Sequence, residues 1–136
     1  MLKGVNLSKG IIVTVANKIG ALADMSKILA DHGINIEAVK GYADNEKAKI
    51  MLVTDDNLRS IDALSKSGYK SAVESEMIML ELENKPGALK NITAKLASEE
   101  IDIKFIYGTT CPGGCPARLV LSTSDNQKAL LALKNI

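Results

Sequence analysis

The chain has 136 residues, of which 46% are hydrophobic and 24% charged, and its formal net charge is +1. This composition is typical of a globular protein, and with one Phe, three Tyr and no Trp it lacks the basic excess and stacking aromatics of nucleic-acid-binding proteins. No apolar run approaches the about 20 residues of a membrane span or forms the core of a signal peptide, so we expect a cytoplasmic protein that binds neither nucleic acid nor membrane.

An internal repeat relates the two halves of the chain at a constant offset of 67 residues. Residues 17–22, NKIGAL, return as residues 84–89, NKPGAL, and the same offset without a gap aligns residues 52–53 with residues 119–120. Each copy is small enough to have only a marginal core, so we expect the copies to pack together. The repeat predicts two modules, residues 1–75 and 76–136.

Each copy opens with a predicted strand followed by a predicted helix. Alternating apolar residues from Ile11 and from Ile78 indicate the strands. The helices have apolar residues at the spacing of one buried face, namely Leu22, Met25 and Leu29 in the first copy and Leu89, Ile92 and Leu96 in the second. Gly33 is expected to end the first helix. Glu100 occupies this position in the second copy. A left-handed backbone conformation costs Glu more energy than Gly, so either this helix end is less favourable or the helix ends differently.

A hairpin and a second helix complete each copy. The hairpins pair a strand after the first helix with strands over residues 47–54 and 117–122. The residues expected to face inward on the leading strands are Ile34, Ile36 and Ala38, and Ile101, Ile103 and Phe105. Second helices fit residues 57–67, with Asp56 or Asn57 as cap, and residues 125–135. Their expected inward residues are Leu58, Ile61 and Leu64, and Leu130, Leu131 and Leu133.

The predicted order of elements is strand-helix-strand-strand-helix-strand, which is the split βαβ or ferredoxin-like order of an α+β fold. In the first copy residues 69–76 supply the last strand, and residues 69–83 are expected to pass into the second copy with hardly any linker. Ile136 aligns with Tyr69, so the second copy has no last strand of its own. Another segment or another chain usually covers such an open edge.

The repeated segments resemble tandem ACT modules, the small-molecule-sensing units attached to many amino-acid metabolic enzymes. The resemblance rests on a strand, residues 84–89, a helix and residues 101–103 in the second copy, and on residues 17–22 and 33–36 in the first. It covers nearly the whole chain from about Ile11. It implies two ferredoxin-like (βαββαβ) ACT-type modules in tandem, the second lacking its last strand, in a freestanding regulatory protein.

The resemblance also implies that a free amino acid or a similar metabolite binds at an interface between modules, without catalysis. A Gly in the strand-to-helix turn lets a ligand approach the backbone, and free N–H groups at the helix start can hold a carboxylate. Asn17 and Asn84 could add a hydrogen bond, whereas Asn35 or Asp102 could accept one from an ammonium group if the neighbouring module places it nearby. The candidate ligand-binding residues are Asn17, Gly20, Ala21, Leu22, Asn35, Asn84, Gly87, Ala88, Leu89 and Asp102. The same turn also fits a purely structural role in which Asn caps the helix.

Cys111 and Cys115 flank a Pro-Gly-Gly turn in the second hairpin. They could form a disulfide, supply two ligands to a soft metal, or remain ordinary thiols. A closed zinc site needs four ligands, so we predict no metal site and keep these two residues as the only candidates for one.

The sequence contains no phosphate-binding loop and no coherent set of catalytic acid, base and nucleophile, so we expect neither an enzyme nor a cofactor. We expect a homodimer that binds a free amino acid and acts as an allosteric regulator of a separate protein. Two alternatives stay open. One is a metal or thiol-redox protein that uses the cysteine hairpin, and the other is a protein–protein adaptor whose sites are vestigial.

Overall fold

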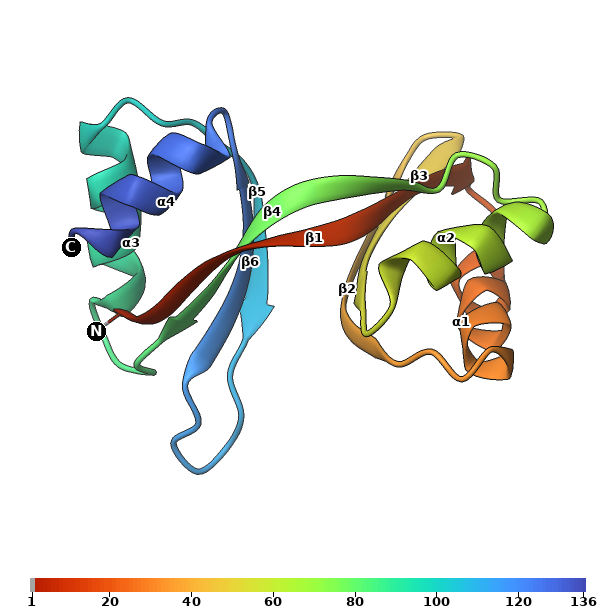
Figure 1. Cartoon of the computed structure of the whole chain (residues 1–136), viewed down its shortest axis with the longest axis horizontal. Helices are drawn as coiled ribbons and strands as arrows, with labels where there is room; N and C mark the ends of the chain where they lie inside the picture. The colour runs from red at the N-terminus through yellow and green to blue at the C-terminus, as the bar shows by residue number, and fades with distance from the viewer. Residues whose placement is uncertain (1) are drawn as a thin grey trace. The chain divides into compact units, whose positions relative to one another are not determined.

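The computed structural model describes residues 2–136, so Met1, which the first predicted module includes, lies outside the described residues. The described chain has an α+β fold of six strands and four helices (Figure 1). In chain order these are β1 (Leu2–Ala16), α1 (Ala21–Asp31), β2 (Ile36–Asp44), β3 (Lys47–Thr54), α2 (Asn57–Lys66), β4 (Val73–Leu82), α3 (Ala88–Ser98), β5 (Ile103–Thr109), β6 (Ala117–Thr123) and α4 (Asn126–Lys134). The antiparallel strand order is β2-β3-β1-β4-β6-β5, which confirms the α+β class. Over residues 2–136, no helix has the length and apolar character that crossing a membrane requires.

The described residues form two compact units. The first unit is Lys9–Ser75, and the second unit is Glu76–Ile136 together with residues 2–8. The predicted modules have the same boundary after residue 75. The prediction placed residues 2–8 in the first module, whereas the structure places them in the second unit. Strand β4 runs through this boundary without a break, as expected for a connection with hardly any linker. That the two units are modules in tandem stays a prediction.

In the first unit, β3 lies between β2 and β1, and α1 and α2 cover one face of these strands (Figure 1). The alternating residues of β1 that were predicted to face a core do so, since Ile11 and Val13 are fully buried. They pack with Met25 and Leu29 of α1 and with Leu64 of α2. The spacing of apolar residues in the sequence therefore identified these five core residues.

In the second unit, β6 lies between β5 and β4, and α3 and α4 cover one face (Figure 1). Strand β1 is the other neighbour of β4. Leu2 and Val5 of β1 pack against the buried cluster that contains Ile78, Leu80 and Leu96. The edge that the sequence left open is thus covered by another segment, the first residues of the chain.

Several residues predicted to face inward are exposed, because small alanines occupy the buried positions beside them. Leu22 is 41% and Leu89 50% exposed, whereas the preceding Ala21 and Ala88 are buried. On the second helices the predictions for Leu58, which is 71% exposed, and Leu131, which is 62% exposed, are wrong.

A second correction concerns the strands that follow α1 and α3. Both strands contain a β-bulge, between Ile36 and Ala38 and between Ile103 and Phe105. A bulge adds one residue and so shifts the alternation of faces. Ile106 therefore packs against the core of the second unit in place of Phe105, whose ring stacks on Tyr107.

The repeat also contains a two-residue insertion that the gap-free alignment missed. Ile11 lies opposite Leu52, whereas its counterpart Ile78 lies opposite Leu121, so the offset is 67 before the hairpin and 69 after it. The insertion falls between β5 and β6, where the cysteines are. Consequently Ile136 corresponds to Ser67 and not to Tyr69.

Candidate functional site

The first helix of each unit begins at a glycine and lacks a side-chain cap. Gly20 and Gly87 precede α1 and α3 with left-handed φ angles of 90° and 88°, and no side chain caps either helix. By contrast, Asp56 and Asp125 cap α2 and α4 by accepting hydrogen bonds from the N–H groups of Arg59 and Lys128. The Ala88 N–H donates to the Lys85 carbonyl at 3.3 Å, and the N–H groups that follow in the first turns of α1 and α3 have no side-chain cap and can receive an anion.

The asparagines of the repeated turn do not cap these helices. The Asn17 amide donates through Nδ2 to the carbonyl oxygen of Asn45 at 3.0 Å, which ties the turn to the β2–β3 hairpin. Asn84, its counterpart, lines two cavities at the start of α3. The purely structural reading of the turn, in which Asn caps the helix, is not what these residues do.

A cavity of about 240 Å³ opens at the start of α3. Three of the predicted ligand-binding residues line it, namely Asn84, Ala88 and Leu89. The opposite wall comes from the β5–β6 hairpin and consists of Gly108, Thr109, Thr110, Ala117 and Leu119, while Leu82, Glu83 and Lys85 complete the lining. The cavity thus combines an open helix N-terminus with hydroxyl, amide and aliphatic groups.

A second cavity of about 260 Å³ shares Glu83, Asn84 and Lys85 with the first and is more charged. The Lys85 ammonium lies 2.9 Å from a carboxylate oxygen of Glu83. This hydrogen bond is the main reason that the pKa of Glu83 is lowered to about 2. Lys3 also lines this cavity and adds a positive charge, so both Lys3 and the helix N-terminus attract an anion here.

A larger cavity lies elsewhere. It has a volume of about 500 Å³ and is lined by Leu2, Asn91, Ile92, Ala94, Lys95 and Ile136. Four of these residues lie along the side of α3, and the other two are Leu2 of β1 and the last residue, Ile136. None of them belongs to the glycine turn at residues 84–87. We place the candidate site in the 240 Å³ cavity, because it includes Ala88 and Leu89 at the open helix start together with converging polar groups.

Asn35 and Asp102 lie at the opposite ends of the first helices from the glycine turns. An α-helix of 11 residues is about 16 Å long, so one small ligand cannot reach both ends of α1 within one unit. The backbone N–H of Asn35 donates to Asp55 and that of Asp102 to Ser124, both at 3.0 Å. Their predicted contact with a ligand requires a second module and stays a prediction.

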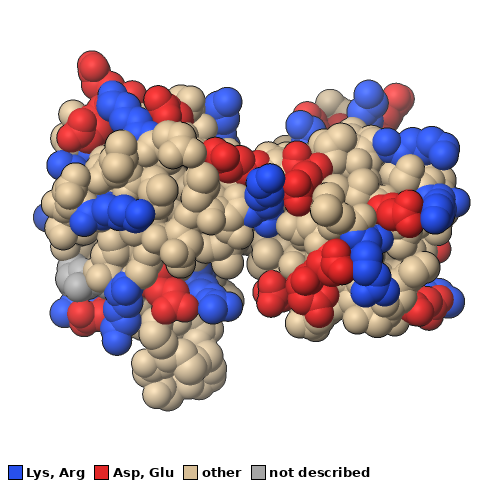
Figure 2. Space-filling model, in the orientation of Figure 1, with Lys and Arg blue, Asp and Glu red and all other residues tan. Residues whose placement is uncertain are grey.

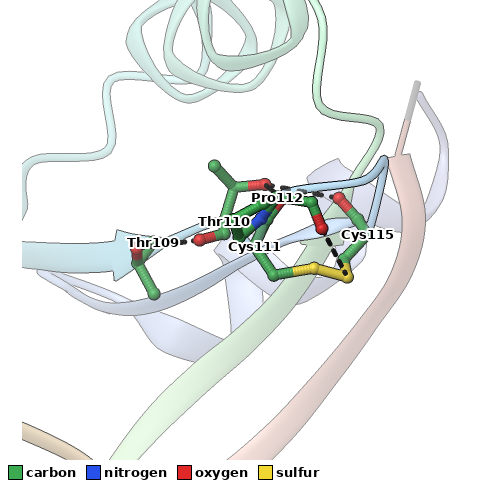
Figure 3. Close-up of a disulfide and its surroundings, with 5 residues drawn as sticks. All are labelled: Thr109, Thr110, Cys111, Pro112 and Cys115. Carbon is green, nitrogen blue, oxygen red and sulfur yellow. Dashed lines mark hydrogen bonds between the residues drawn. A yellow bond between two sulfur atoms is a disulfide. The ribbon is translucent and has the colours of Figure 1, made fainter.

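Cys111 and Cys115 form a disulfide, with Cα atoms 5.4 Å apart, at the tip of the β5–β6 hairpin (Figure 3). Neither sulfur is a free thiolate in this state. Residues 2–136 also contain no group of three or more His, Cys, Asp or Glu side chains placed to hold a metal ion. Of the alternatives that the sequence left open, the structure contains the disulfide.

A network of hydrogen bonds that no prediction included occurs once in each unit. Thr54 donates through N–H and Oγ1 to Asn57 Oδ1, and Asn57 donates through Nδ2 to the Lys9 carbonyl. Thr123 and Asn126 repeat these bonds, with Glu76 accepting in place of Lys9. The signal in the sequence is TDDN at 54–57 and TSDN at 123–126, which the gap-free alignment placed out of register.

Comparison with known proteins supports one ACT domain. A family model described as the ACT domain matches residues 10–61, which lie within the first unit. No curated protein matches the chain in sequence.

Solved structures share the fold at low sequence identity. A protein of Bacteroides thetaiotaomicron is 21% identical with a TM-score of 0.88, over 96% of this chain and 89% of that chain. The ligand-free regulatory subunit of aspartate kinase from Thermus thermophilus is 15% identical with a TM-score of 0.70, over 98% of this chain and 97% of that chain. Aspartokinase III of E. coli, in complex with lysine and aspartate, is 16% identical with a TM-score of 0.56, over 98% of this chain and 33% of that chain.

Proposed function

We propose that this chain is a non-catalytic regulatory protein, built from two ACT modules in tandem, that binds a small carboxylate-bearing metabolite of the amino-acid class. The observation that carries the proposal is the cavity at the start of α3, where the left-handed Gly87 leaves the helix N-terminus without a side-chain cap. The ACT match to residues 10–61 and the likeness to a regulatory subunit of aspartate kinase support the regulatory role.

The tandem arrangement is supported by interactions that recur in both units. Besides the Thr–Asn network, Arg59 of α2 donates to the carbonyl of His32, which ends α1, and Lys128 of α4 donates to the carbonyl of Glu99, which ends α3. The same pair of helices is therefore joined in the same way in each unit. A shared ancestry of the two units accounts for this agreement more simply than chance does.

The lining of the 240 Å³ cavity suits a small amino acid. Its volume lies below the about 300 Å³ at which cavities for drug-sized ligands begin. The ligand carboxylate would accept hydrogen bonds from N–H groups in the first turn of α3, and the Asn84 amide would add another. The aliphatic side chains of Leu82 and Leu119 would contact the ligand side chain. Asp102 and, at the first unit's turn, Gly20, Ala21 and Leu22 belong to further sites that require a neighbouring module.

Regulation would follow from differential affinity. A ligand that binds one arrangement of modules more tightly than another shifts the population toward it, and it transmits no more than that difference in affinity. The chain would act in this way as a homodimer and pass the change to a separate protein.

The test is a thermal unfolding screen against the common amino acids, each at about millimolar concentration, with Gly87→Asp and Gly20→Asp as matched variants. The new carboxylate at position 87 would occupy the helix start and repel an anion there. A ligand at about 100 times its Kd stabilises by about 2.7 kcal/mol, which raises the Tm by several degrees. We expect a shift in the native chain that Gly87→Asp removes at the α3 cavity, whereas Gly20→Asp, which alters only a further site, should keep the shift that the α3 cavity contributes. Flat curves across the panel would refute the proposal.

A further inference from the structure

The Cys111–Cys115 disulfide closes a loop that forms part of the candidate site. Of the loop, residues 110–116, Thr110 lines the 240 Å³ cavity, beside Ala117 at the start of β6. Gly114 and Pro116, within the loop, line the 260 Å³ cavity next to it. Both cavities also contain Asn84 of the repeated turn, so the loop and the start of α3 face each other across the same space.

Little besides the disulfide holds this loop in place. The β5–β6 ladder ends at the pair Thr109 and Arg118, and Ala117 is paired with Leu82 of β4, so residues 110–116 are outside the sheet. Thr110 Oγ1 donates across the loop to the Cys115 carbonyl at 3.3 Å, which is longer than the usual 2.7–2.8 Å of an O–H···O bond (Figure 3). Gly113 and Gly114 both have left-handed φ angles, of 87° and 88°, and glycines lose more conformational freedom on ordering than other residues do.

The corresponding hairpin of the first unit needs no such link. There the β2–β3 ladder continues to the pair Asp44 and Lys47, which leaves only Asn45 and Glu46 in the turn. The two-residue insertion thus produced a longer loop, and the cysteines lie in that loop. A change at the disulfide should affect the second unit alone.

The disulfide is accessible to a reductant. Cys115 is exposed, and the segment from Thr109 to Ala117 contains no charged residue. Figure 2 shows the tip of this hairpin as an uncharged projection. Attack by a thiolate on a disulfide requires such access.

We propose that the Cys111–Cys115 pair is a redox switch that sets the order of the cavity wall at the start of α3, and through it the affinity of the candidate site. A dithiol reductant, such as a protein of the thioredoxin class, supplies two electrons and two protons. The S–S bond breaks, two thiols form, and the reductant becomes a disulfide. The inference goes beyond the proposed function and extends it, because it assigns a regulatory input to that site.

The direction of the effect follows from entropy. With the disulfide intact the wall is already ordered, so a ligand does not have to order it on binding. In the reduced chain the ligand must immobilise the loop, at about 0.5–1.5 kcal/mol for each side chain that becomes ordered, and one or two side chains then correspond to an affinity about tenfold lower.

Amide hydrogen exchange of the ligand-free chain, oxidised and then reduced with dithiothreitol, tests the switch without any knowledge of the ligand. We expect several-fold faster exchange on reduction both in residues 110–116 and in residues 84–89. Residues 17–22, the same turn in the first unit, should not change. The double variant Cys111→Ser/Cys115→Ser should exchange like the reduced chain with or without dithiothreitol, which separates the loss of the bond from other effects of the reductant.

Faster exchange confined to residues 110–116 would overturn the proposal, because the loop would then be uncoupled from the start of α3. Unchanged exchange throughout would overturn it too, as would two free thiols in the chain purified without reductant. Repeating the amino-acid panel on both redox states adds the affinity readout. If no amino acid shifts the Tm but reduction accelerates exchange in both segments, the proposed ligand class is wrong and the redox switch stands. If an amino acid binds the oxidised and reduced chains with equal affinity, the disulfide does not control the affinity of the site.

Discussion

At Gly108, strands β5 and β6 approach each other too closely for any side chain. A Cβ atom at this position would lie 2.9 Å from the Cα atom of Leu119, and closer still to the Arg118 carbonyl oxygen. At Gly41, the counterpart in the first unit, a Cβ would meet only the Ile50 side chain, at 3.9 Å. Packing therefore requires glycine at position 108 of the second unit, whereas position 41 of the first unit can accept a side chain.

We predict that Gly108→Ala lowers the free energy of unfolding by about 2 kcal/mol, because backbone must move to admit the methyl group. Gly41→Ala, the matched control, should stay within about 0.5 kcal/mol. Urea unfolding at constant m-value measures both changes. Equal effects of the two substitutions would contradict the difference in backbone approach.

Glu83 provides a prediction about pH. Its folded pKa of about 2 lies below the ordinary value of 4.5, chiefly because of the hydrogen bond to Lys85. A lowered carboxyl pKa stabilises the folded state above pH about 4.5, and this contribution disappears as the pH falls toward 2. In Lys85→Met we expect the Glu83 pKa to rise, measured by carbon NMR titration of its carboxyl group.

The matched control for this titration is Lys18→Met. Lys18 occupies the position of Lys85 in the first repeat, where Ala16 replaces Glu83. It should leave the Glu83 pKa unchanged. A Glu83 carboxyl that still titrates near pH 2 in Lys85→Met would show that another group holds it ionised.

At the scale of elements, helices α1 and α3 end in the same way although their residues differ. Gly33 has a φ of 69° and Glu100 a φ of 57°, and both donate their N–H to the carbonyl three residues earlier. Glu100 thus adopts the left-handed backbone conformation that was expected to be less favourable for Glu than for Gly. Since a Cβ at Gly33 would meet nothing within 4 Å, the difference between the two residues lies in the backbone and not in packing.

Glu100→Gly should therefore stabilise the chain by about 0.5–1 kcal/mol, and Gly33→Glu should destabilise it by about 1–2 kcal/mol. Shifts of opposite sign in Tm provide the measurement. Should Glu100→Gly lower the Tm, a favourable contact of the Glu100 side chain must outweigh its backbone strain.

Local patterns explain which elements could be predicted from the sequence. Helices α2 and α4 start where Asp56 and Asp125 offer a cap, and the core residue Leu64 follows from helical spacing alone. The bulge before Phe105 depends on how β5 pairs with β6, which no local pattern records. The hairpin wall of the candidate cavity was missed for the same reason, because Thr109 and Thr110 lie near the start of α3 only through strand pairing.

At the scale of the whole molecule, strand β1 contributes to both units. Its residues from Lys9 onward belong to the first unit and residues 2–8 to the second. The repeat predicted an open edge in the second copy, and it could not identify the segment that covers it. Residues 2–8 precede the region of internal similarity and alternate poorly, with Gly4 between Leu2 and Val5, so their pairing with β4 leaves no periodic signal.

This topology predicts that a change near the N-terminus destabilises residues that lie more than seventy positions away in sequence. Val5 packs against the core of the second unit and makes no part of the first unit's core. In Val5→Asp, a carboxylate would enter that apolar contact without a partner, so we expect the second unit to lose about 2 kcal/mol of stability. Amide exchange should accelerate in β4, β6 and α4 while β3 and α1 keep their protection.

The exposed Asn6 provides the control, since Asn6→Asp adds the same charge on the same strand without entering the core. It should leave exchange unchanged in both units. If Val5→Asp instead accelerated exchange equally in both units, the strands β1 and β4 that cross the boundary would make the chain one cooperative folding unit. If it accelerated neither, residues 2–8 would contribute no stability to the second unit, and the open edge there would need another cover, such as a second copy of the chain.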